Sequence, residues 1–124
     1  MVCPVTGETV RRWREIYNER MAPVDNAATL TARDEKEIVA SGGACFVHDH
    51  GVLLGIGWVR SEEILCVAAV QPGAGERVLG TLLTLIHGDT AVLDVASTNT
   101  RAIRLYERMG FVAVRERTKW YKIF

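Results

Sequence analysis

The amino-acid sequence predicts an α/β domain with a mixed sheet, and three observations support this prediction. Apolar residues recur at helical spacing over residues 8–21, which indicates an amphipathic helix. Alternating and unbroken apolar runs over residues 44–70 are typical of strands. From residue 64 onwards the pattern becomes strand, helix, strand, helix and strand. Because 124 residues suffice for one domain and the sequence contains neither a repeat nor a linker, we predict a single domain spanning 1–124.

The composition excludes several classes of protein. A hydrophobic content of 48% and a charged content of 24% are ordinary for a folded domain and exclude a disordered chain. Fifteen basic and fifteen acidic residues give a formal net charge of +0, which argues against nucleic acid and membrane surfaces as partners. Cys3, Cys45 and Cys66 are odd in number and widely spaced, so we expect reduced thiols. Since the sequence shows no signal peptide and no apolar run long enough to span a bilayer, we expect a cytoplasmic protein.

Two helices are predicted before the first strand. The first covers 8–21, and its apolar face consists of Val10, Trp13, Ile16 and Tyr17. The second begins at Thr31, because Asp34 three residues later has the spacing of a capping box. Gly42 and Gly43 then end it.

Three strands follow these helices. Residues 44–48 and 52–60 are predicted to pair as a hairpin around the turn 49–51. After a second turn at 61–63, residues 64–70 form an unbroken apolar run. Such a run is typical of a strand that is covered on both faces.

The second half alternates helices with strands. Residues 76–87 have an amphipathic pattern, 91–96 predict a strand, and a helix runs from Thr98 or Asn99 to Met109. Gly110 ends that helix. The tail 111–124 is rich in β-branched and aromatic residues, which predicts one bent strand or two.

The turn after the buried strand is a candidate phosphate-binding site. If the strands separate after Val70 and residue 96, the helix that follows Gly73 points its N-terminus into the resulting cleft. Free amides and the positive end of the helix dipole bind phosphates, and Arg77 adds a charge. Taken alone, such a glycine-rich turn is more often a plain connection between a strand and a helix.

A second motif is more specific. Residues 99–111 read Asn-Thr-Arg-Ala-Ile-Arg-Leu-Tyr-Glu-Arg-Met-Gly-Phe and fit Asn-x-x-Ala-x-x-Leu-Tyr-x-x-x-Gly-Phe at every fixed position. Here the chain closely resembles the GNAT superfamily of N-acetyltransferases, particularly its small single-domain members. The resemblance covers roughly residue 44 to the C-terminus. It implies two leading helices and a central, mostly antiparallel sheet that is splayed at the cofactor cleft.

The resemblance also implies an activity. The donor would be acetyl-CoA, the acceptor an amine, and the transfer direct, with no covalent enzyme intermediate and no metal. Tyr106 matches the general acid that protonates the departing thiolate of coenzyme A, with packing on an apolar helix face as the alternative reading. The resemblance implies that the pantetheine arm pairs with the backbone of Ala68 to Val70 and that the amides of residues 76–81 bind the diphosphate. The individual residues expected to contact the cofactor are Ala68, Val70, Gly75, Arg77, Val78, Gly80, Thr81 and Asn99.

Several residues depart from the family pattern or have two readings. Gly75 stands where Arg or Gln is usual, and Glu76 adds a negative charge beside the phosphates. Val78 puts a β-branched side chain where Gly is usual, which predicts that the phosphates are obstructed from the amides. These departures favour the alternative function, a GNAT-fold binding or regulatory module without catalysis and with weak or no coenzyme A binding. Asn99 serves as a cofactor contact, a helix cap or both, and Glu63 is a candidate proton acceptor or part of a solvated turn.

The N-terminus raises a question about the sheet edge. Residues 1–6 are barely long enough for the strand that commonly precedes the first helix in the family. The sheet either lacks this strand or takes an edge from another chain, which favours a homodimer. His48 and His50 have no third ligand near them, so we predict no metal site.

Overall fold

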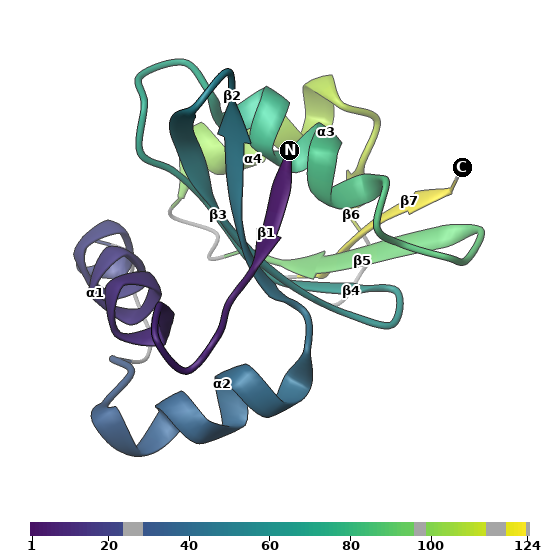
Figure 1. Cartoon of the computed structure of the whole chain (residues 1–124). Helices are drawn as coiled ribbons and strands as arrows, with labels where there is room; N and C mark the ends of the chain where they lie inside the picture. Colours follow the sequence, from purple (N-terminus) through teal and green to yellow (C-terminus); the bar gives the residue numbers. More distant parts are fainter. Residues whose placement is uncertain (24–28, 96–98, 114–118, 124) are drawn as a thin grey trace.

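The computed structural model describes residues 1–23, 29–95, 99–113 and 119–123 (Figure 1). In chain order the elements are β1 (Val2–Pro4), α1 (Val10–Met21), the 3₁₀ turn η1 (Ala32–Asp34), α2 (Glu35–Ser41), β2 (Ala44–Asp49), β3 (Val52–Arg60), β4 (Glu63–Ala69), α3 (Gly75–Leu83), β5 (Thr90–Asp94), α4 (Thr100–Arg108), β6 (Val112–Ala113) and β7 (Lys119–Ile123).

These strands form one sheet with helices on both faces. The strand order is β1-β2-β3-β4-β5-β7-β6, and every neighbouring pair is antiparallel except β4 with β5. One apolar cluster includes the sheet-facing residues of α1 and α2, and the other includes those of α3 and α4 (Figure 1). The predicted mixed α/β fold is confirmed. No helix in the described parts of the chain is long and apolar enough to cross a membrane.

The two leading helices are held to each other and to the sheet. Helix α1 begins two residues later than predicted, and its wholly buried Trp13 donates its indole N–H to the Cys45 carbonyl of β2 at 3.1 Å. Arg14 of α1 forms an ion pair with Glu35 of α2 at 2.7 Å. The predicted capping box is present, although it opens η1, and α2 follows directly.

The leading strand exists, so its predicted absence is wrong. Residues 2–4 pair with residues 45–47 of β2. Met1 extends this pairing, because its amino group donates to the His48 carbonyl at 2.8 Å and its carbonyl accepts from the His48 N–H at 2.8 Å. Three residues suffice for this strand because the chain then turns at Thr6 to enter α1. Because β1 occupies this edge of the sheet, the expectation of a homodimer loses the support of a missing first strand.

Two glycines of β3 allow α3 to lie unusually close to the sheet. A Cβ atom on Gly55 would lie 2.8 Å from Cγ2 of Val78, and still closer to the Ala68 carbonyl. A Cβ atom on Gly57 would lie 2.6 Å from Cδ1 of Leu82. Val78 and Leu82 are four residues apart and therefore share one helix face, which is fully buried. The glycines thus provide the space that these two side chains fill.

Helix α3 ends at Leu83, whereas the sequence predicts a helix to His87. After Leu83 the backbone bonds shift to i−3 acceptors, from Thr84 N–H to Thr81 O at 3.1 Å and from Leu85 N–H to Leu82 O at 3.0 Å. The Thr84 hydroxyl also donates to the Thr81 carbonyl at 2.6 Å. Periodicity did not reveal this end because 3₁₀ and α spacings differ little over one turn.

We expect Gly57→Ala to destabilise the protein by about 1–3 kcal/mol, because the added methyl group would lie 2.6 Å from Cδ1 of Leu82 and overpack the contact between α3 and β3. Urea unfolding of the variant measures this change. Gly7→Ala is the matched control, since a Cβ atom there meets nothing within 4 Å, and its effect should stay within about 0.5 kcal/mol. Equal stability of the two variants would contradict the close packing of α3 on β3.

Alkaline pH should also destabilise the fold. Burial raises the pKa of Cys45 from 9.0 to about 11 and raises the pKa of the fully buried Cys66 further. Both thiols therefore keep their protons in the folded protein at pH values where the unfolded chain releases them. The contribution of the two thiols to the free energy of unfolding is complete below pH 9. It is lost as the pH rises from 9 to 11 and beyond, by about 1.4 kcal/mol per pH unit for each thiol. The free energy of unfolding, measured at a series of pH values, should decline less steeply in Cys66→Ala, and an unchanged slope would refute this assignment.

Candidate active site

Strands β4 and β5 separate after Ile64 and Leu93, six residues earlier on β4 than the separation after Val70 that the sequence suggested, and residue 96 lies outside the described residues. They pair in parallel only where Glu63 meets Val92 and Ile64 meets Leu93. On its other side β4 carries one extra residue, Leu65, because Trp58 of β3 faces Cys66 whereas its neighbour Val59 faces Ile64. A bulge of this kind changes which backbone groups point to each side of the strand.

The bulge directs two amides of β4 into the open side of the sheet. The Val70 N–H donates to the Leu54 carbonyl at 2.8 Å, so the backbone groups of Val70 and Ala68 point towards β3. Neighbouring residues of a strand alternate, and the amides of Ala69 and Val67 therefore point to the side from which β5 has separated. Of residues 68–70, which the sequence assigned to the pantetheine arm, only Ala69 has an amide that points to this open side. Val67, which the sequence analysis missed, joins it, and only the register of β3 with β4 could have revealed this.

Tyr106 lies on the sheet-facing side of α4. Its side chain is 6% exposed, and its ring packs on Phe111 with centroids 5.8 Å apart. Burial, and secondarily the Cys66 thiol of β4, raises the pKa of Tyr106 to about 12. The hydroxyl therefore holds its proton at neutral pH.

Asn99 caps α4. Its side-chain oxygen accepts a hydrogen bond from the Ala102 N–H at 3.3 Å, and its carbonyl accepts from the Ile103 N–H at 3.1 Å. The predicted cap is confirmed, whereas the predicted cofactor contact stays a prediction. The other candidate cap, Thr98, lies outside the described residues.

The N-terminus of α3 presents backbone amides. The Val78 N–H makes the first intrahelical bond, to Ala74 O at 3.0 Å, so the amides of Gly75, Glu76 and Arg77 have no acceptor within the helix. The side chain of Val78 is fully buried against Gly55, and it therefore does not block these amides as the sequence suggested.

Two further residues predicted to contact the cofactor lie deeper in the helix. The Thr81 hydroxyl donates to the Arg77 carbonyl at 2.9 Å, within α3 itself. A Cβ atom on Gly80 would lie 3.8 Å from Met109 of α4. Gly80 and Thr81 therefore serve the packing and the geometry of α3, one turn beyond its free amides.

Arg77 has a partner that the sequence did not indicate. Its guanidinium donates to the carboxylate of Asp49, at the end of β2, and Nδ1 of His50 lies 2.8 Å from the same carboxylate. The hydrogen bond from Arg77 is the main cause that holds the pKa of Asp49 below its usual range. The positive charge expected at the phosphates is thus compensated within the protein.

The structure places Glu63 at the end of β4 that pairs with β5, away from the open side of the strand. Glu63 is the first residue of β4 and pairs with Arg60 at 3.4 Å. Val67, where the open side of β4 begins, is four residues further on, about 13 Å along the strand. The geometry favours the reading of Glu63 as part of a solvated turn.

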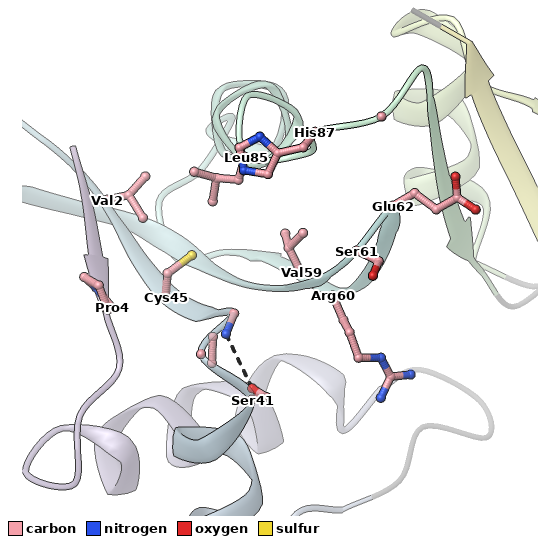
Figure 2. Close-up of a pocket in the computed structure, with 14 residues that line it drawn as sticks. Val2, Pro4, Ser41, Cys45, Val59, Arg60, Ser61, Glu62, Leu85 and His87 are labelled. Atoms are coloured by element: carbon pink, nitrogen blue, oxygen red, sulfur yellow. Dashed lines mark hydrogen bonds between the residues drawn. The ribbon is translucent and has the colours of Figure 1, made fainter.

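The pocket in Figure 2 is a different site. Its volume is about 830 Å³, and it lies where α2 leads into β2 and β3 turns into β4. Cys45, Val59 and Leu85 line it together with His87, while Arg60 and Glu62 stand at its side (Figure 2). None of the residues discussed above as cofactor contacts lines it.

The sequence matches no family model. It is similar to the mycothiol acetyltransferase of Acidimicrobium ferrooxidans, with 34% identity over 89% of this chain and 42% of that protein. It is also similar to the mycothiol acetyltransferase of Mycolicibacterium gilvum, with 39% identity over 53% of this chain and 27% of that protein. The chain spans less than half the length of the curated relatives it matches.

Solved structures share the fold over the whole chain. A GCN5-related N-acetyltransferase from Rhodopseudomonas palustris has a TM-score of 0.75 at 18% identity, with 100% of this chain and 95% of that one covered. The Salmonella typhimurium protein yncA, solved with its cofactor acetyl-CoA, has a TM-score of 0.68 at 18% identity and covers 99% and 92%. Arabidopsis thaliana Naa50, solved with the bisubstrate analogue CoA-Ac-MVNAL, has a TM-score of 0.68 at 16% identity and covers 100% and 98%.

This chain therefore has the fold of the GCN5-related N-acetyltransferases. Its curated relatives are both named mycothiol acetyltransferase.

Asn99 permits a test that separates its two predicted roles. Asn99→Ala should lose about 1 kcal/mol of stability with the cap. Asn99→Asp keeps an oxygen that can cap α4 but removes the amide donor, so it should keep the stability of the wild type while binding coenzyme A more weakly. Thermal unfolding and calorimetric titration measure the two effects. Unchanged affinity in Asn99→Asp would leave Asn99 as a cap alone.

Proposed function

We propose that this chain transfers an acetyl group from acetyl-CoA directly to an amine acceptor. The observation that carries the proposal is the open side of β4, into which the amides of Val67 and Ala69 point. Tyr106, on the sheet-facing side of α4, keeps its hydroxyl protonated at neutral pH. Support also comes from relatives named acetyltransferases and from neighbours solved with acetyl-CoA or a coenzyme A analogue.

The residues present suit acetyl-CoA, which supplies a reactive thioester when bound. Val67 and Ala69 offer the pantetheine arm a strand edge, since no strand of the described residues pairs with them on that side. The amides of Gly75, Glu76 and Arg77 offer the diphosphate a helix N-terminus. Because Val78 is buried towards β3, it leaves that end of the helix accessible.

Within this arrangement the chain performs two tasks. An amide of Val67 or Ala69 polarises the thioester carbonyl by donating a hydrogen bond to its oxygen. When the uncharged amine forms its bond to the carbonyl carbon and the carbon–sulfur bond breaks, Tyr106 gives its proton to the sulfur. The amine loses one proton to solvent, and Tyr106 recovers one from solvent. A positioned general acid of this kind contributes about 10²–10⁴-fold to the rate.

Two observations favour the second candidate, a GNAT-fold binding or regulatory module without catalysis. Gly75 replaces the usual Arg or Gln, and Asp49 compensates the charge of Arg77. Titration with acetyl-CoA by calorimetry tests the two candidates together. Micromolar affinity, about 8 kcal/mol, supports the enzyme. No detectable binding would contradict the enzyme and support the module, which has weak or no affinity for coenzyme A. Binding without acetyl transfer to any of a panel of amines would also contradict the enzyme.

The general acid is tested with two tyrosines. Tyr106→Phe keeps the ring that packs on Phe111 and removes only the proton donor, so kcat should fall about 100-fold while affinity for acetyl-CoA is retained. Tyr17→Phe is the matched comparison, because burial and Cys66 also raise the pKa of Tyr17, from the face covered by α1. It should keep kcat. Steady-state kinetics measure both variants, and a loss in Tyr17→Phe alone would assign the proton donor to Tyr17.

A further inference from the structure

Helices α3 and α4 pack side by side and run in the same direction. A Cβ atom on Gly75, the first residue of α3, would lie 3.2 Å from Cδ2 of Leu105. One turn later in both helices, a Cβ atom on Gly80 would lie 3.8 Å from Cε of Met109. Since both contacts advance together along the two chains, the helices are parallel, and their N-termini point the same way.

The two N-termini are not level. The first residue of α3 lies beside Leu105, whereas α4 begins at Thr100, five residues earlier. At 1.5 Å per residue, α4 extends about 7.5 Å beyond the end of α3. This projecting turn stands next to the free amides of α3, where the proposed function places the diphosphate.

Arg101 lies on the appropriate side of the projecting turn. It precedes Leu105 by four residues, so the two share the side of α4 that faces Gly75. Arg104 directly precedes Leu105 and lies about 100° around the helix from it, which turns it away from α3. Both arginines are exposed.

The N-terminus of α3 has no free cation of its own. Gly75 carries no side chain, Glu76 is exposed and negative, and Arg77 is held by Asp49. None of the ion pairs among the described residues involves Arg101. A guanidinium matches the geometry of phosphate oxygens and can donate two hydrogen bonds to them.

We propose that Arg101 of α4 binds the diphosphate of the acyl-CoA substrate and supplies the positive charge that α3 lacks. This inference rests on the proposed function. It makes the phosphate site a joint product of two helices: α3 contributes amides and α4 contributes the cation.

The test is calorimetric titration with two probes, coenzyme A and 3′-dephospho-coenzyme A. Arg101→Gln should weaken the binding of both probes about 10-fold or more, as expected for the loss of a hydrogen bond to a charged group. Arg101→Lys should recover part of the loss, since it restores the charge without the planar fork. Arg108→Gln is the matched control, because it removes the same charge from the same helix about 10 Å further from the site.

The possible results lead to different conclusions. Equal affinities of Arg101→Gln and the wild type for both probes would overturn the inference and leave the proposed function intact. A loss confined to coenzyme A would place Arg101 at the 3′-phosphate and overturn the assignment to the diphosphate. A loss in Arg77→Gln in place of Arg101→Gln would return the role to α3. If the wild type binds neither probe, the proposed function fails, and this inference fails with it.

Discussion

The close packing of α3 on β3 is the contact on which the rest of this structure depends. Gly55 and Gly57 leave the space that Val78 and Leu82 fill, and the depth of this contact sets where the first turn of α3 stands relative to the sheet. Helix α4 is then placed against α3 through Gly75 and Gly80. The free amides of α3, the cap of α4 and the ring of Tyr106 therefore take their positions from one apolar interface.

The open side of β4 depends on a second constraint, the bulge at Leu65. Without the extra residue, the alternation that pairs β4 with β5 at Ile64 would continue, and the amides pointing to the open side would belong to different residues. The bulge transfers this role to Val67 and Ala69. The apolar character of β4 is compatible with this arrangement because clusters cover both of its faces.

The candidate site could be predicted from the sequence only where a local pattern is specific. The spacing from Asn99 to Phe111 located the cap and the tyrosine correctly, because both follow from a single helix. The obstruction expected from Val78 does not occur, since the direction of its side chain depends on a space in a strand over twenty residues earlier. The partner of Arg77 was equally hidden, because Asp49 approaches it from another hairpin.

The sequence by itself determined the order of the elements, the two leading helices, the buried strand and the helix motif, since each rests on periodicity or on capping within a few residues. Tertiary structure alone decided the last turn of α3, the existence of β1, the amides of β4 that face the open side, and the position of Glu63 at the paired end of β4. The physical reason is the same in each case. Strand register, a close approach between helix and sheet, and charge pairing across elements depend on which distant segments meet, and no local pattern carries that information.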